Sequence, residues 1–321
     1  MAERIPKIVV IGPAFIDMAV KCQTHPAPGE IVDGSGFTTI PAGTGVNEAI
    51  QVALCGCETY LLARVGEDCF GELIRQHLER YKIQTGLLYP TQAMSTGIIV
   101  TVVDSQGENC GCRSFGANRI LSRDEIDCAA AEQQIGSADA ILIDDTIPHP
   151  AVVAAIRSAQ IHKTRVVLSV DLPHPNREVV QMLDWPMEFY NTDILVLSFQ
   201  GMSCVSELGA GGEGDLKFIG TELIARGAKC VVMSLGWRGA LVIDRQGLRH
   251  LEGIAAEVID QNGCDSAFNG ALTGCFGTGD PPDQAVRFAI AAESIQRGRF
   301  GLQESLPRKE EILTVLQGLP D

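Results

Sequence analysis

The sequence lacks long apolar runs and is short of positive charge. No stretch approaches the roughly 20 apolar residues of a membrane-spanning helix. The apolar run Ile8–Ile11 is too short and too soon interrupted for a signal peptide. Against 40 Asp and Glu residues there are only 25 Lys and Arg residues, which gives a net charge of −15. This excess of acid argues against nucleic acid or an anionic membrane as the main partner.

Several metal and nucleotide motifs are also missing. The six histidines have no metal-ligand spacing, and the close pairs Cys55–Cys57 and Cys110–Cys112 have no second pair at zinc spacing, so we assign no metal ligand. The phosphate-binding pattern G-x-x-x-x-G-K-[ST] is absent. The eleven cysteines are an odd number scattered along the chain. They predict free thiols in a reducing cytoplasm, most of them small buried side chains.

The chain is long and apolar enough to form a large core. It has 321 residues, of which 45% are hydrophobic, so it fits two domains or one large α/β domain with an insertion. Short Val- and Ile-rich runs alternate with helical patterns, which is typical of a mostly parallel sheet flanked by helices. We expect strands at 5–11, 59–63, 140–143, 165–170, 194–197 and 230–234, and helices at 47–54, 70–81, 151–159, 215–226, 266–275, 282–296 and 309–316.

Two segments interrupt this alternation. Residues 31–40 and 96–114 are extended, with turns at Asp33–Gly34 and Gln106–Gly107, and they predict a small accessory sheet. The stretch Gly209–Gly214 fits G-x-G-x-x-G, but no Val- or Ile-rich strand leads into it. We therefore interpret it as a flexible surface loop, and an NAD-dependent oxidoreductase is the least favoured function.

The most informative stretch for chemistry surrounds Asp265. This residue follows a turn that contains Gly263 and opens an amphipathic helix, where free N–H groups and the helix dipole favour an anion. A carboxylate beside a bound anion would accept the proton of a hydroxyl that attacks phosphorus. On spacing alone, a plain helix cap is the favoured explanation of Asp265.

An ordered series of motifs resembles the ribokinase-like, or PfkB-type, carbohydrate and nucleoside kinases. The Ala42–Ala49 segment is similar to the family's first signature, and Asp265–Leu272 is similar to its second. The resemblance extends over nearly the whole chain. Its other segments, in family order, are Gly12–Asp17, Pro28–Glu30, Gly66–Gly71, Gly107–Asn109, Gly116–Asn118 and Ser234–Gly239.

The resemblance implies one α/β domain over residues 1–321, with a doubly wound sheet and a small β lid from about 12–41 and 96–115. It implies ATP- and Mg²⁺-dependent phosphorylation of a sugar or related polyhydroxy compound, and a homodimer formed through the lid. Some relatives use a monovalent cation such as K⁺, and the sequence leaves that requirement open.

The resemblance also implies roles for individual residues. Asp265 would be the general base, with Gly263 and Cys264 forming the anion hole. Substrate hydroxyls would be held by Asp17, Gly43 and Asn47, and the nucleotide would lie along Ser198, Ser234, Gly236 and Gly239. Taken singly, Asp17 fits a turn cap, Asn47 a helix N-cap and Ser234–Gly239 a hairpin turn.

Three departures from the family pattern concern the phosphate side. The Asp260–Asp265 turn is one residue shorter than usual, which bears on how its N–H groups are aimed. Gly201 stands where the family has a metal-linked Glu, and Thr44 stands where many relatives have Lys. A second hypothesis therefore stays open, namely a protein that binds a sugar or nucleoside without phosphorylating it.

Other acidic residues follow predicted strands, but the sequence does not assign them to the active site. Asp144–Asp145 follows a predicted strand, and we interpret it as a solvated acidic pair. Asp171, with Asn176 and Arg177, fits either a substrate contact or a capped helix start.

Overall fold

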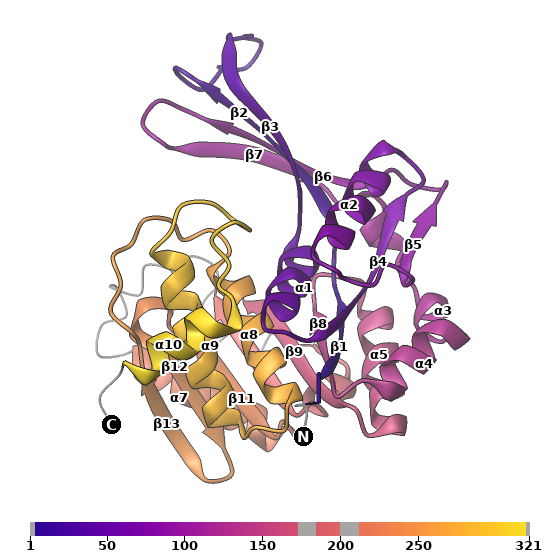
Figure 1. Cartoon of the computed structure of the whole chain (residues 1–321), viewed down its shortest axis with the longest axis vertical. Helices are drawn as coiled ribbons and strands as arrows, with labels where there is room; N and C mark the ends of the chain where they lie inside the picture. Colours follow the sequence, from indigo (N-terminus) through magenta and orange to yellow (C-terminus); the bar gives the residue numbers. More distant parts are fainter. Residues whose placement is uncertain (1–3, 173–183, 200–211, 319–321) are drawn as a thin grey trace.

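The chain forms two β-sheets in a computed structural model that describes residues 4–172, 184–199 and 212–318 (Figure 1). The main sheet has nine strands in the order β13-β12-β11-β10-β9-β8-β1-β4-β5, and the small sheet has four in the order β3-β2-β6-β7. The main-sheet strands are β1 (Lys7–Ile11), β4 (Glu58–Gly66), β5 (Leu88–Thr91), β8 (Ala140–Asp144), β9 (Arg165–Leu172), β10 (Ile194–Phe199), β11 (Cys230–Ser234), β12 (Gly239–Asp244) and β13 (Gly247–Glu252).

The main sheet is mostly parallel, as the sequence predicted. All neighbours from β5 through to β11 pair in parallel, whereas β11–β12 and β12–β13 pair antiparallel at one edge. Alternate residues of β1 belong to two separate cores: Val9 and Ile11 lie in one, Ile8 and Val10 in the other. Burial on both faces explains why the strands read as continuous apolar runs.

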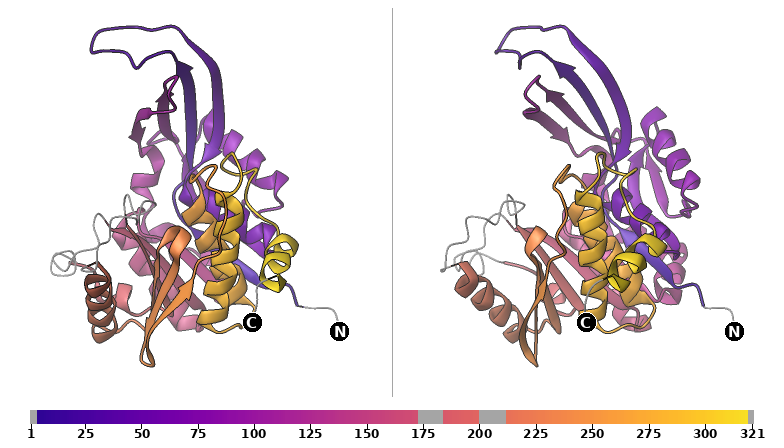
Figure 2. Two further views of the ribbon diagram at one scale, coloured as in Figure 1. Left: turned by 90° about the vertical axis from the view of Figure 1, so that its left-hand side faces the viewer. Right: turned by 60° about the vertical axis from the view of Figure 1, so that its left-hand side comes forward.

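Helices cover both faces of this sheet (Figures 1 and 2). One core contains side chains of α3 (Arg123–Ile126), α4 (Ala129–Ser137), α5 (His149–His162), the short helix η2 (Met187–Tyr190) and α7 (Gly212–Ala225). The opposite core contains side chains of α1 (Thr44–Leu54), α2 (Cys69–Arg80), α8 (Cys264–Gly277) and α9 (Pro282–Arg297). The last helix, α10 (Lys309–Gln317), packs on α9.

The small sheet extends away from this body (Figure 2). Its strands are β2 (Phe15–Cys22), β3 (Gly34–Ala42), β6 (Gly97–Val103) and β7 (Asn109–Ser114). β2 pairs with β3 antiparallel and with β6 in parallel, so two distant segments of the chain form one sheet. β3, β6 and β7 overlap the two segments where the sequence predicted an accessory sheet, whereas β2 lies outside both.

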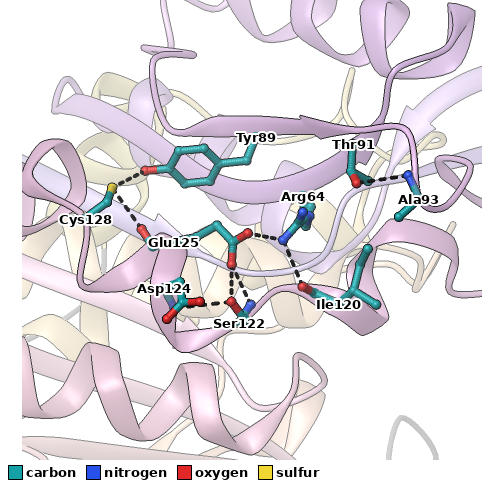
Figure 3. A network of polar contacts seen from close by, with 9 residues as sticks. All are labelled: Arg64, Tyr89, Thr91, Ala93, Ile120, Ser122, Asp124, Glu125 and Cys128. Atoms are coloured by element: carbon teal, nitrogen blue, oxygen red, sulfur yellow. Dashed lines mark hydrogen bonds and ion pairs between the residues drawn. The ribbon is translucent and has the colours of Figure 1, made fainter.

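A polar network joins β4 to the segment that follows the small sheet in the chain (Figure 3). Arg64 of β4 pairs with Glu125 of α3 and donates to the Ile120 carbonyl at 3.0 Å, at the end of the short helix η1 (Gly116–Ile120). The Glu125 carboxylate also accepts from the Ser122 amide at 2.9 Å, which caps α3. This network fixes the base of the small sheet relative to the main sheet.

Two expectations about local structure were wrong. Of the ten cysteines in the described ranges, only Cys22, Cys55 and Cys230 are buried; the others are partly or fully exposed, because most lie on outer helix turns or on β7. Residues 212–214 are not a loop but the first turn of α7, and the rest of that glycine-rich stretch lies outside the described residues.

Two features are absent from the described part of the chain. None of the helices there combines the length and apolar character needed to cross a membrane. Nor do these residues contain three or more His, Cys, Asp or Glu side chains grouped to hold a metal ion directly.

Candidate active site

One pocket lies where the carboxyl ends of the central strands meet the small sheet. Parallel strands end at the same edge of a sheet, and ligands of open α/β sheets bind at that edge. Asp144 of β8, Ser169 of β9 and Ser198 of β10 line the pocket from the main sheet. The small sheet and the first turns of α1 and α8 supply the other walls.

The first turn of α1 brings Gly43 and Asn47 to the pocket. Gly43 is the N-cap with φ of 102°, and a Cβ there would lie 2.7 Å from the Pro13 carbonyl, so only glycine fits. Asn47 is inside the helix rather than at its cap, and its Oδ1 accepts from Gln303 Nε2 at 2.7 Å. This contact fixes the orientation of the Asn47 amide in the pocket wall.

Asp17 lines the pocket from β2 of the small sheet. It sits within the strand, so the interpretation as a turn cap was wrong. Thr101 on the neighbouring β6 donates to Asp17 Oδ1 at 3.4 Å, and burial raises the pKa of the Asp17 carboxyl. Its position leaves it facing the same cavity as Asn47.

Asp265 lies in the first turn of α8 and faces the pocket. The N-cap is Gly263, so the interpretation of Asp265 as the helix cap was wrong. Asp265 is exposed to solvent at the pocket. Desolvation, helped by the negative charge of Asp171, raises its pKa to about 6. A carboxyl with this pKa is suited to take up a proton near neutral pH.

The floor of the pocket contains a buried carboxylate that joins three elements. Asn269 Nδ2, one turn after Asp265 on α8, donates to Glu48 Oε1 at 2.9 Å and to Ser169 Oγ at 2.8 Å. Glu48 Oε2 is buried without a hydrogen-bond partner. Burial, and then the nearby charge of Asp144, raise the pKa of Glu48 well above its usual range.

The acidic pair after β8 is not solvated, contrary to the sequence-based interpretation. Asp144 is 5% exposed, and both Asp144 and Asp145 line the pocket. Desolvation and the charge of Asp144 raise the pKa of Asp145 to about 8. Asp171 is in strand β9 and also lines the pocket, while Asn176 and Arg177 lie outside the described residues.

The structure gathers part of the predicted site. Asp17, Gly43, Asn47, Ser198 and Asp265 line one pocket, whereas the other predicted residues do not form its walls. Gly263 and Cys264 lie immediately before Asp265 in the turn that starts α8.

The predicted nucleotide residues Ser234, Gly236 and Gly239 lie around the short helix η4 (Gly236–Arg238), which joins β11 and β12 as a hairpin connection. Ser234 ends the strand next to β10, so it lies at the same sheet edge as Ser198. Gly201, the position of the family's metal-linked Glu, lies outside the described residues.

Sequence reasoning missed several pocket residues. Asp144 stands at the carboxyl end of a predicted strand. This position indicates a ligand site, because ligands of open α/β sheets bind at that edge. Glu48 lies inside the first signature, but the sequence analysis assigned it no role. Arg113 of β7 also lines the pocket, and no sequence signal identifies it because the register of the small sheet is not visible in the sequence.

Solved structures with the same arrangement define the fold class as ribokinase-like. A ribokinase of Arabidopsis thaliana, complexed with ribose and ATP, superposes with a TM-score of 0.85 at 23% identity, covering 98% of this chain and 100% of that chain. A ribokinase of Thermotoga maritima superposes with a TM-score of 0.81 at 24% identity, covering 98% and 100%.

Sequence comparison then places the chain in a family. A ribokinase of Bacillus subtilis is 26% identical over 313 residues, 96% of this chain and 99% of the relative. A deoxyribokinase of Salmonella typhi is 23% identical over 308 residues, 95% and 96% of the two chains. The model of the pfkB family carbohydrate kinases matches residues 5–309. The chain therefore belongs to the pfkB family of carbohydrate kinases.

Proposed function

We propose that this protein transfers the terminal phosphoryl group of ATP to a hydroxyl of a sugar or related polyhydroxy compound. The observation that carries the proposal is that hydroxyl-binding groups, Asp17 and Asn47, share one pocket with Asp265 at the start of α8. The family and the ribose and ATP of the Arabidopsis thaliana structure support the same reaction.

The substrate side consists of groups that accept and donate hydrogen bonds. The Asp17 carboxylate accepts from two adjacent hydroxyls, and the Asn47 amide both accepts and donates. Because Gly43 has no side chain, a substrate can approach the backbone at the start of α1. These groups orient one hydroxyl toward Asp265 and exclude bulk water from it.

The chemical step uses Asp265 and the turn before it. Asp265 takes the proton of the substrate hydroxyl as its oxygen attacks phosphorus and the bond to the ADP leaving group breaks. The backbone N–H groups of Gly263 and Cys264 would donate to the oxygens of the transferred phosphoryl group. For this the Cys264 N–H must leave the Gln261 carbonyl, to which it donates at 3.4 Å. Ser198, Ser234, Gly236 and Gly239 would lie along the nucleotide, at the carboxyl edge of β10 and β11.

The residues around the pocket fit a hydrated Mg²⁺ ion. This ion usually keeps several waters and binds through one or two carboxylates and substrate phosphates. Asp144 and Asp171 at the ends of β8 and β9, and the unpartnered Glu48 Oε2, are oxygen donors of this kind. When bound, Mg²⁺ supplies positive charge to the phosphate oxygens.

The test is ADP release by the purified protein with excess Mg²⁺ and K⁺ against a panel of sugars and nucleosides. Asp265→Asn keeps the size of the side chain and removes the base, so turnover should be lost while a panel member still raises the melting temperature. Unchanged turnover in Asp265→Asn would reject the base assignment.

A second function is favoured by the short turn before Asp265. If no panel member is phosphorylated but one raises the melting temperature, the protein binds a sugar or nucleoside without transferring phosphate. Calorimetry with Mg·ATP separates the two functions, because a kinase must bind the nucleotide. Inserting a Gly between Cys264 and Asp265 should then raise activity, since it restores the usual loop length.

We also propose that the small sheet is a lid that pairs with a second copy of the chain. β3 carries exposed apolar side chains, Phe37 at 67% and Ile40 at 37% exposure, which a dimer would cover. Light scattering should give twice the mass of the 34.3 kDa chain, and Phe37→Ser should shift the protein toward the monomer. A monomeric parent protein would reject this assembly.

A further inference from the structure

Arg113 is the one Lys or Arg side chain that lines the described pocket. The same walls carry six carboxyl groups: Asp17, Glu48, Asp144, Asp145, Asp171 and Asp265. Of the described groups around this pocket, Arg113 and the N–H groups at the start of α8 attract an anion, whereas the ionised carboxylates repel it. A neutral polyhydroxy compound would not require a cation among these walls.

The small sheet places Arg113 on the substrate side. Its strands pair in a row that runs from Asp17 on β2 through Ile99 on β6 to Arg113 on β7, and all three residues line the pocket. Residues opposite one another on adjacent strands face the same way. Two strand spacings separate the Cα atoms of Asp17 and Arg113 by roughly 10 Å, so one sugar-sized molecule can contact both side chains.

Aromatic rings hold the guanidinium of Arg113 in place. It lies 4.4 Å from the ring centroid of Phe115 and 5.9 Å from that of Phe15. Across the described ranges of the chain, no carboxylate forms an ion pair with it. A stacked guanidinium keeps its N–H groups directed outward in its plane, where they match the two oxygens of a carboxylate or phosphate.

We propose that the substrate carries an anionic group, a carboxylate or a phosphate monoester, that Arg113 binds while Asp17 holds hydroxyls. This inference rests on the proposed kinase function and narrows its substrate class to acidic sugars. The anionic group lies at the end of the substrate away from the hydroxyl that Asp265 deprotonates.

The test compares three related compounds, one neutral and two anionic: an aldose, its aldonic acid and its 6-phosphate. The ratio kcat/KM should be at least ~10-fold higher for one of the anionic compounds, because hydrogen bonds between charged groups are the strong ones. The carboxylate and phosphate arms of the panel identify which anion is bound.

Variants then assign the preference to Arg113. Arg113→Met keeps much of the stacking area and removes the charge, so kcat/KM for the anionic compound should fall by ~10- to 100-fold, while that for the neutral aldose changes less than ~3-fold. Arg119→Met is the matched control, because Arg119 stacks on the same Phe115 ring at 5.1 Å but does not line the pocket. The control should keep the anion preference.

Three results would overturn the inference. A neutral sugar could be the best substrate, with Arg113→Met unchanged. Arg113→Met could lower turnover of neutral and anionic compounds equally and raise KM for ATP, which would place Arg113 at the transferred phosphate. If nothing in the panel is phosphorylated, the kinase function fails, and the inference is tested by melting-temperature shifts instead. A shift with anionic compounds that Arg113→Met abolishes supports the inference. The absence of such a shift rejects it.

Discussion

Gln296 of α9 donates a hydrogen bond to the carbonyl of Asn262 at 2.8 Å, in the turn that starts α8. The same Nε2 atom lies 3.2 Å from the Gly301 carbonyl and 3.1 Å from that of Leu302. One buried amide thus joins the turn before Asp265 to the loop after α9. Protein contacts therefore hold the shortened turn through its carbonyl side. Under the proposed function, they would also preset the N–H groups that receive the phosphate.

Replacing Gln296 by Leu should loosen this turn. Buried carbonyls that lose their donor cost about 1–3 kcal/mol each, so the melting temperature should fall. The rate kcat should fall more than KM for the sugar changes, because Asp17 and Asn47 are untouched. Steady-state kinetics and thermal unfolding measure both effects. Gln284→Leu on the exposed face of α9 is the control. Equal effects of the two variants would contradict the role of Gln296 in holding the turn before Asp265.

The rate should depend on pH through Asp265. Its pKa is raised to about 6, so below that pH the carboxyl is neutral and cannot accept a proton. We expect kcat/KM to rise as the pH is raised from about 5 to about 7. Asp145 has a pKa of about 8 and is already neutral near pH 6, so Asp145→Asn should not change this rise of kcat/KM with pH. A flat profile over this range would contradict the assignment of Asp265 as the base.

Gly263 should not tolerate a side chain. Its φ is 81°, and a Cβ would lie 2.9 Å from Leu302 Cδ1 and 3.1 Å from Gln296 Nε2. Gly263→Ala should cost about 1–2 kcal/mol in unfolding free energy from the backbone alone, and it should lower kcat because the turn moves. Gly214→Ala in α7 meets no atom within 4 Å and should stabilise by about 0.5–1 kcal/mol. Denaturant titration of both variants tests this contrast.

The fold was largely predictable because its signals are local. Val- and Ile-rich runs buried on both faces, such as β1 and β8, have no other stable arrangement than the interior of a parallel sheet. The edge strands β13 and β5 were missed, because they carry few apolar residues and a weak pattern. β12 was missed although it is apolar and buried like the strands that were predicted.

The site was predictable only where the residues belong to contiguous motifs. Asp17, Asn47 and Asp265 follow turns or helix starts that can be seen in the sequence. Arg113 enters the pocket because β6 and β7 pair in one particular register, and a shift of one residue would turn it to the other face. Asp144 was misjudged because its burial depends on the packing of α8 and α5 on β8, which one segment alone does not show.

Glu48→Gln should stabilise the protein, and more so as the pH rises. The folded state raises the pKa of Glu48, so it favours the neutral form; stability is therefore lost as the pH rises from the unfolded pKa toward the folded one. Gln keeps the oxygen that accepts from Asn269 and cannot ionise. The melting-temperature difference between variant and parent should grow from about pH 5 to about pH 8. Glu48→Ala, which leaves Asn269 without this acceptor, should destabilise instead. A constant difference across this range would show that the folded state does not raise the pKa of Glu48.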